Sequence, residues 1–411
     1  MFNKIADFFR RQTWNFRILL IHGILVGGGR QGVIHALTGQ YTNLYIVALG
    51  ASKIQLGLIQ SLQRATRVFL SVPIGQVIDR ISLKKILLLG MMLEFLAPLM
   101  YGLAINWYMV IPAALLISTS WPIRGTVRNI LLADSLEDTS RATGFSVFST
   151  IGAIPGIFMP FISAFIVESF GGINVAGIRP LFYIQFVFLA PISLLVYWKI
   201  KEPKRDRSKK SVSVLESFKK FLVFEKGPRT WILVWVLDSF GMLALFFLTV
   251  FAVEVKGATP SILAWMGMAS TIAGIVFTIP YGRLADKIGR KPALYFGLIP
   301  TFSFIFFLIY CPSPEWLILV GVLQGAWTAN FAVWHTITME LVPKQLLGSF
   351  SGIQGMVTGV SSVIASLLAG ILWETISPYA VFLVALAFET SAILLAIPIP
   401  ETLKKTRAIL K

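Results

Sequence analysis

The chain has 411 residues, of which 56% are hydrophobic and only 13% are charged, against roughly 25% charged in an average soluble domain, so an ordinary soluble protein is excluded. One cysteine and three widely spaced histidines exclude a disulfide framework and argue against a zinc site, so we expect neither a metal nor a cofactor. The formal net charge of +17 does not indicate nucleic-acid binding, because the basic residues fall mostly in short segments between apolar runs.

The apolar runs predict an all-α polytopic membrane protein with twelve spans. A bilayer core about 30 Å thick takes roughly 20 apolar residues per helix, and strands would leave backbone groups unpaired in lipid. Hydropathy, interrupted by glycine, proline and charge, places the spans at 15–46, 53–79, 86–105, 108–133, 142–168, 178–198, 230–254, 261–285, 293–310, 315–340, 349–371 and 378–398.

The basic residues between the spans predict the topology. If residues 1–14 are cytoplasmic, nearly all loop Lys and Arg lie on that side, and the opposite loops hold only Lys53, Arg179 and Lys256. The positive-inside rule then predicts a protein of the cell (inner) membrane with both termini in the cytoplasm. The first apolar stretch is longer than the core of a signal peptide, so we interpret it as an uncleaved first span.

One long polar segment, at 199–229, divides the chain. It begins with a run of basic residues, and its second part has the apolar spacing of an amphipathic helix lying on the anionic inner surface or of a solvated tether. We therefore expect an N-terminal six-helix bundle (1–198), this linker (199–229), a C-terminal six-helix bundle (230–398) and a basic tail (399–411).

An internal repeat is the strongest signal in the sequence. At an offset of 207, GQVIDRISLKK in the first half recurs as GRLADKIGRKP in the second, and Gly50-Ala51-Ser52 recurs as Gly257-Ala258-Thr259. Repeated halves in a membrane protein imply two pseudo-symmetric bundles with a site between them near the midplane.

The second-half segment, Gly282 to Lys291, resembles the cytoplasmic signature of the major facilitator superfamily, and the first-half copy is degenerate because Ser82 replaces its second glycine. The resemblance implies a transporter with a conformational latch. Asp134 is a plausible partner for Arg80, although these loops could serve only to set orientation. The residues expected to take part in gating are Gly75, Asp79, Arg80, Asp134, Arg141, Gly282, Asp286, Gly289, Arg290 and Lys291.

Arginines inside the predicted spans are confined to the first half. Ionisable residues in a membrane are costly and usually face a cavity, so they are candidates for function. Guanidinium binds carboxylate or phosphate, which predicts an anionic substrate; alternatively, the arginines pair internally with Glu94, Asp134 or helix carbonyls. Arg128 is the one nearest the cytoplasmic end and fits pairing best. The predicted substrate contacts are Arg30, Arg64, Arg67 and Arg124.

The second half instead offers one acid and several aromatic residues. We expect Asp238, Trp235, Trp327 and Phe331 to line the cavity and bind an apolar portion of the substrate, although tryptophans in membrane helices commonly just pack. Asp238 and His335 are the candidates for proton coupling. Glu94 and Glu389 could also titrate, but they lie on spans that are peripheral in the family, so we expect them to be paired structurally instead.

The predicted function is secondary active transport by alternating access, with an anionic or amphiphilic organic substrate. The alternatives are a lipid or glycolipid flippase, a multidrug exporter and, from another class, a membrane sensor without turnover. No nucleophile and base occur at recognisable spacing, so we do not expect an enzyme. The expected partners are a small-molecule or lipid-like anion and membrane lipids, with no nucleic acid and a monomeric chain.

Overall fold

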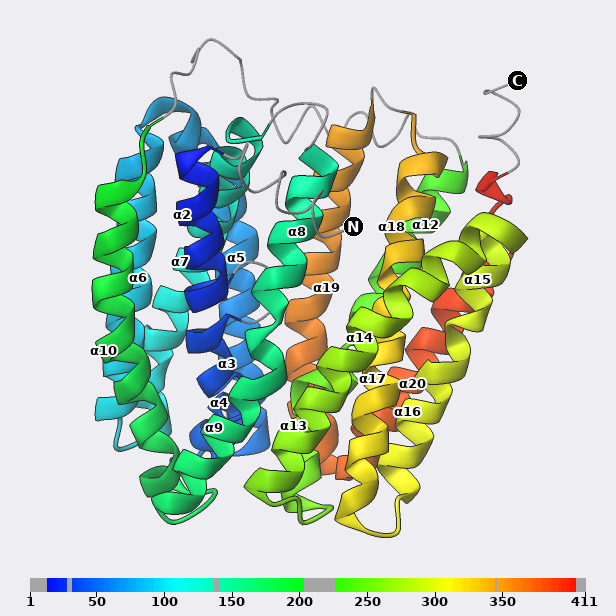
Figure 1. The fold of residues 1–411 in the computed structure, drawn as a ribbon. Coiled ribbons are helices and arrows are strands. Elements are labelled where there is room, and N and C mark those ends of the chain that lie inside the picture. The colour runs from blue at the N-terminus through cyan, green and yellow to red at the C-terminus, as the bar shows by residue number, and fades with distance from the viewer. Residues whose placement is uncertain (1–12, 28–31, 137–140, 203–225, 344–345, 404–411) are drawn as a thin grey trace. The chain divides into compact units, whose positions relative to one another are not determined.

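The computed structural model describes residues 13–27, 32–136, 141–202, 226–343 and 346–403, without the side chains of residues 72, 75–77, 79–80, 141–143 and 146. Within these ranges the regular structure is entirely helical (Figure 1). Nine helices there are long and apolar enough to cross a membrane. The predicted all-α membrane fold is confirmed, and the count of twelve spans stays a prediction.

Two long helices, α5 (Lys53–Arg80) and α7 (Val110–Asp134), are not among these nine. They carry the intramembrane arginines Arg64, Arg67, Arg124 and Arg128, whose charges lower the mean hydropathy of the segment. The same residues that point to function therefore weaken the membrane signal of their helices.

The helices form two compact units, each described separately below. Unit 1 contains Met1–Gly50 and Phe69–Ser211, and unit 2 contains Ala51–Val68 and Val212–Lys411. Residues 51–68, the start of α5, thus belong by contact to unit 2. The predicted linker helix and most of the basic tail lie outside the described residues, and the predicted domain boundaries stay a prediction.

Unit 1 contains the part of α5 from Phe69 onward and a sequence of mostly long helices. Packing joins α6 to α7 and α10, and α10 in turn to α3 and α9. The remaining elements of the unit are α2 (Trp14–His22), the π-helix η1 (Gly23–Gly27), α3 (Val33–Gly39), α4 (Thr42–Ala48), α6 (Leu83–Leu103), the 3₁₀ turn η2 (Trp107–Met109), α7, α8 (Arg141–Ala153), α9 (Pro155–Ser169) and α10 (Val175–Lys199).

Unit 2 contains the start of α5 and the second-half helices. Helix α14 packs along α17, α12 lies between α19 and α20, and α16 contacts α17 and α20. The elements are α12 (Lys226–Gly241), α13 (Leu243–Glu254), α14 (Pro260–Ile288), α15 (Arg290–Phe296), α16 (Leu298–Tyr310), the 3₁₀ turn η4 (Pro314–Trp316), α17 (Leu317–Ala329), α18 (Phe331–Leu341), α19 (Leu347–Thr375) and α20 (Pro378–Ala396).

The repeat seen in the sequence has a structural counterpart at the start of α5 and of α14. Gly50 and Gly257 both have positive φ, at 92° and 69°, a conformation that glycine adopts without a steric penalty. Two residues later, the hydroxyls of Ser52 and Thr259 accept hydrogen bonds from the amides three residues ahead. The offset of 207 therefore marks the same helix start in each half.

Several expected spans are broken into two helices. In unit 2 the breaks fall at Met242, Gly297 and Asn330. The side chain of Asn330 fills the space that a Cβ on Gly297 would need, so two of the breaks pack against each other where α16 meets α17. Hydropathy does not report such breaks, because the residues on both sides remain apolar.

Candidate functional site

A buried ion pair lies at the centre of unit 1. Glu94 on α6 is 2% exposed and Arg124 on α7 is 7% exposed. The Arg124 Nη2 pairs with Glu94 Oε1, and its Nε donates to Ser120 Oγ at 2.9 Å. The Ser120 hydroxyl in turn donates to the Gly90 carbonyl at 2.8 Å. A buried guanidinium thus has a carboxylate and a hydroxyl as partners, as burial of charge requires.

The same carboxylate also holds His35 on α3. His35 Nε2 is 2.6 Å from Glu94 Oε1, and the Gln185 side-chain amide on α10 is 3.3 Å from His35 Nδ1. Thr38 donates its hydroxyl to Gln185 Oε1, which leaves the Gln185 NH₂ to donate to Nδ1. The Nε2 of His35 is then the protonated nitrogen and donates to Glu94. Four helices are tied together by this network.

Arg64 on α5 has a different environment, inside unit 2. Its Nε donates to Ser366 Oγ on α19 at 2.6 Å, and its guanidinium carbon lies 3.7 Å from the centroid of the Phe246 ring on α13. Within the described part of the chain, no carboxylate pairs with it. Arg67 lies one turn further along the same face of α5.

The predicted aromatic residues of unit 2 are packed together and mostly buried. The Trp235 ring lies 5.3 Å from Trp334 and 6.4 Å from Phe331, and Trp327 lies 6.4 Å from Phe331. Trp231 joins the cluster and donates its Nε1–H to the Thr338 hydroxyl at 2.7 Å. These contacts are those of a helix core, which was the alternative to a substrate-binding surface.

Asp238 is fully enclosed on α12, one turn after Trp235. It is 3% exposed, and its Oδ1 is a buried oxygen without a hydrogen-bond partner. His335 is exposed on α18 and contacts the Trp235 ring at 5.4 Å, but the described contacts include no bond from it to Asp238. Asp238 lies one turn after Trp235 on α12, and His335 contacts the Trp235 ring from α18.

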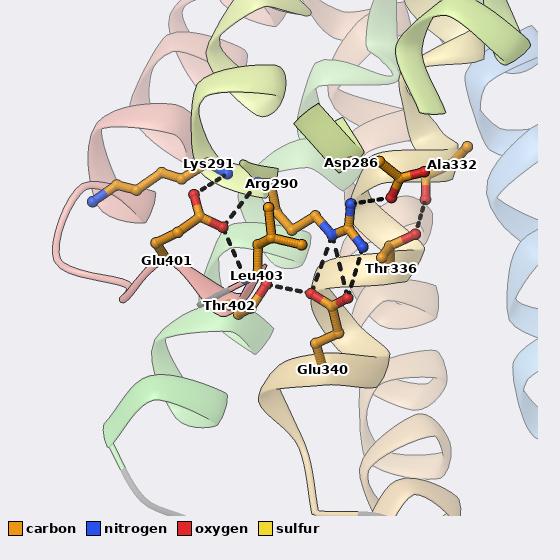
Figure 2. Close-up of polar contacts among 9 residues, drawn as sticks. All are labelled: Asp286, Arg290, Lys291, Ala332, Thr336, Glu340, Glu401, Thr402 and Leu403. Carbon is orange, nitrogen blue, oxygen red and sulfur yellow. Dashed lines mark hydrogen bonds and ion pairs between the residues drawn. The ribbon is translucent and has the colours of Figure 1, made fainter. Parts of the chain in front are cut away.

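A further cluster joins the turn between α14 and α15 to the segment after α20 (Figure 2). Arg290 donates to Asp286 Oδ1 at 2.5 Å and to both carboxylate oxygens of Glu340 on α18 at 3.0–3.2 Å. The Thr402 hydroxyl donates to the same Glu340 carboxylate at 2.6 Å. Gly289, at φ 116°, provides the turn that aims Arg290 at these acids.

Glu401 completes this cluster by accepting backbone hydrogen bonds. Its two oxygens accept from the amides of Arg290, Lys291 and Leu403 at 2.9–3.0 Å (Figure 2). Partial burial raises the pKa of the Glu401 carboxyl, but these amide bonds and the charge of Arg290 outweigh it, so the pKa lies below its ordinary value. The first turn of α15 is thereby capped by an acid from the end of the chain.

Unit 1 has a similar arrangement, in which Glu202 holds the start of a helix as Glu401 does in unit 2. We call these two arrangements the glutamate clasps. The carboxylate of Glu202, just after α10, accepts from the Ser82 hydroxyl at 2.6 Å and from the Leu83 amide at 3.1 Å, at the start of α6. Ser82 and Gly289 correspond at the offset of 207. Each half therefore ends in a glutamate that holds the beginning of its third predicted span.

Sequence comparison decides the family. The chain matches the profile of the Major Facilitator Superfamily over residues 23–257 and 240–409. The chain belongs to this superfamily. The earlier resemblance, the transporter class and the non-enzymatic nature of the family are thereby established for this chain.

Curated relatives agree with the superfamily assignment. The chain is 27% identical over 352 residues to an uncharacterized MFS-type transporter of Methanocaldococcus jannaschii, covering 83% of this chain and 84% of the relative. It is 35% identical over 108 residues to a probable nitrate transporter, NarT, of Staphylococcus aureus. That second match covers 25% of this chain and 28% of the relative.

Solved structures of superfamily transporters share the fold. A mutant of the nucleoside transporter NupG superposes with a TM-score of 0.78 at 15% identity, covering 94% of this chain and all of that one. A D-xylose-proton symporter superposes with a TM-score of 0.70 at 14% identity, covering 95% of this chain and 98% of that one. At these identities the likeness shows the superfamily fold alone.

Not every residue predicted for the superfamily site can be placed. Arg30 lies outside the described residues, as do the side chains of Gly75, Asp79, Arg80 and Arg141, so the proposed contact between Arg80 and exposed Asp134 stays a prediction. Gly282 lies within α14, and Lys291 lies in the first turn of α15, where its Nζ donates to the Ile397 carbonyl.

Sequence reasoning missed several partners in the two units. Glu340 and Glu401 had not been linked to Arg290, nor Ser366 and Phe246 to Arg64. One signal was available: both Glu202 and Glu401 stand beside a proline just after the last apolar run of their half. The expected pairing of Glu94 is present, whereas the described contacts give Glu389 no basic partner.

Proposed function

We propose that this chain is a proton-coupled secondary transporter of a small anion, working by alternating access, with Arg64 as an anion-binding residue. It acts as a monomer in the cell (inner) membrane with both termini in the cytoplasm. The observation that carries the proposal is the environment of Arg64. Its guanidinium is held by a hydroxyl and an aromatic ring, without a carboxylate among its described partners.

Comparison of three arginines supports this choice. Arg124 is neutralised by Glu94, and Arg290 by Asp286 and Glu340. Among the described residues, the hydrogen bond of Arg64 uses Nε, which leaves its two terminal nitrogens for the bidentate geometry in which guanidinium binds planar anions. Arg64 is half-buried, and an anionic substrate would supply the counter-ion that a partly desolvated cation lacks.

The partial match to a probable nitrate transporter supports a small anion over an amphiphile. Nitrate is planar and carries a single charge, which suits a guanidinium that already lies against an aromatic ring. Trp235, one of the residues expected to bind an apolar portion of the substrate, packs against Trp334, and its contact with substrate stays a prediction. Substrate contact by Arg67 and Arg124, and by Arg30, stays a prediction.

In this proposal, the Arg290 cluster is part of the latch that alternates during transport. Its ion pairs join α14, α15 and α18 with the segment after α20, so they resist relative movement of those elements. Opening would exchange these bonds for water, and closing would re-form them.

The test is anion uptake by the purified full-length chain in proteoliposomes, using nitrate first and then other monovalent anions. We expect Arg64→Ala to raise the KM for the transported anion roughly 10- to 100-fold, since a hydrogen bond to a charged group contributes about 1.5–3 kcal/mol. Arg64→Lys should recover part of this loss, because it restores charge without the planar fork.

The matched control is Arg229→Ala, which removes an exposed arginine at the start of α12. We expect it to leave the KM unchanged. Equal KM values for the native chain and Arg64→Ala, across all transported anions, would exclude Arg64 from the binding site. Absence of transport for every anion by the native chain would count against anion transport itself.

A further inference from the structure

Two buried acids face each other in unit 2. Asp238 on α12 is 3% exposed and Glu389 on α20 is 2% exposed, and these two helices pack against each other. The carboxyls lie within electrostatic range of each other. Asp238 Oδ1 and Glu389 Oε1 are both buried oxygens without a hydrogen-bond partner.

Gly241 makes the room for this arrangement. It lies three residues after Asp238, on the same side of α12, and a Cβ at this position would overlap the carboxyl group of Glu389. Helix α12 ends at this residue, so the Glu389 carboxyl lies against backbone at a helix break. The missing side chain at Gly241 therefore leaves space for the Glu389 carboxyl one turn from Asp238. We call this space the cradle.

No basic side chain is placed to neutralise these acids among the helices packed on them. Helices α13, α16, α18, α19 and α20 contain no lysine or arginine, and those of α12 are in its first turn, about 13 Å or more along the axis from Asp238. The other titratable groups on these helices are Glu254, His335, Glu340, Glu374, Tyr310 and Tyr379. Of these, His335 contacts Trp235, the residue one turn before Asp238 on α12.

Neighbouring carboxyls buried without a counter-ion cannot both be ionised, because like charges repel and neither is solvated. We propose that Asp238 and Glu389 together form the proton-binding site of the transporter, with Glu389 as a second proton-holding residue. This inference rests on the proposed anion transport, because it names the group that carries the coupled proton.

The proton moves between water and a carboxylate oxygen of the pair. When the pair is exposed to water, one O–H bond breaks and the proton leaves to the solvent, and the remaining negative charge is hydrated. When the pair is enclosed, as it is here, the carboxylate must take a proton from water before closure, because an unpaired charge in an apolar core is strongly disfavoured. Closure is therefore possible only in the protonated form.

Proton-driven nitrate uptake tests the role of the pair. With one proton carried per nitrate, the cycle is electroneutral, and a gradient of one pH unit supports about tenfold accumulation. We expect the native chain to approach that ratio, and Glu389→Gln and Asp238→Asn to fall toward a ratio of one. Glu315→Gln, which changes an exposed acid in η4, should retain the native ratio.

Infrared difference spectroscopy of the purified full-length proteins, without any substrate, tests proton binding directly. The native chain should show the carbonyl band of a buried protonated carboxylic acid, and this band should decrease in Glu389→Gln and in Asp238→Asn. An unchanged band in both variants, or native accumulation ratios in both, would overturn the assignment. If no anion is transported at all, the infrared result still decides the proton site, so failure of the two proposals is distinguishable.

Discussion

Glu94 in unit 1 and Asp238 in unit 2 are both buried carboxyls in the middle of apolar helices, but they are neutralised by different means. Glu94 has Arg124 and His35 beside it, held in register by Ser120 and Gln185. Asp238 has Glu389, a second acid. A fixed cation makes the first acid a structural element, whereas a proton, which can leave, makes the second one available for a cycle.

The largest effect should come from removing the fixed cation. Arg124→Gln leaves Glu94 buried without its arginine partner, and breaking a buried pair typically costs about 3–5 kcal/mol. We expect much less folded protein to survive heating in detergent. The measurement is the monodisperse peak in size-exclusion chromatography after heating. Asp238→Asn replaces an acid that has no cation beside it and belongs to a protonated pair, so it should change the free energy of unfolding by less than about 1 kcal/mol.

The double variant Arg124→Gln/Glu94→Gln sharpens this contrast. Removing both partners leaves no unpaired charge, so part of the stability should return and the two substitutions should be strongly non-additive. Additive losses would show that the ion pair is not what stabilises the centre of unit 1.

A smaller effect should follow from filling the cradle in unit 2. In Gly241→Ala, the new methyl overlaps the Glu389 carboxyl, and overpacking of this kind costs about 1–3 kcal/mol. The matched control is Gly274→Ala in α14, where the nearest atoms would be 3.8 Å from the added Cβ. Equal thermal stability for the two variants would mean that the Glu389 side chain can move away from Gly241. The acid pair of unit 2 would then not be a fixed arrangement comparable with the Glu94–Arg124 pair of unit 1.

The smallest effect concerns the two glutamate clasps, which unlike the central acids are similar in both units. Because the pKa of Glu401 is lowered in the fold, its contribution is complete above the ordinary carboxyl pKa, about 4.3, and is lost as the pH falls through the lowered value. Glu401→Gln should abolish this pH dependence and modestly increase hydrogen exchange at the amides of Arg290 and Lys291. Glu202→Gln is the matched variant in unit 1 and should change exchange at Leu83; unaltered exchange at these three amides would show that the clasps do not stabilise the helix starts.

Much of the fold followed from the sequence because its main determinants are local or repeated. Apolar length fixes the helices, and the offset of 207 aligns Gly50 with Gly257 and Ser52 with Thr259, which the structure shows to be matching helix starts. The helix breaks at Met242, Gly297 and Asn330 were not predicted, because they depend on which residue of a neighbouring helix fills the gap.

The candidate site was less predictable than the fold. A sequence shows that Arg64 and Arg124 are both intramembrane arginines, but only packing shows that one lies beside Glu94 and the other beside Phe246. Likewise, Glu389 was expected to be paired structurally, yet the helices packed around it supply an acid and no base. Such differences depend on the rotation of each helix about its axis, which hydropathy does not determine.

The helix contact at Gly297 also has a counterpart in the first half of the chain. Gly297 corresponds to Gly90 at the offset of 207, and at both positions a side chain would overlap the neighbouring helix: Asn330 in unit 2, and Ile123 with Arg124 in unit 1. Position 330 itself corresponds to position 123. The two halves therefore share a glycine at this helix contact and differ on the facing helix, where one has an amide and the other an aliphatic side chain next to a charged one.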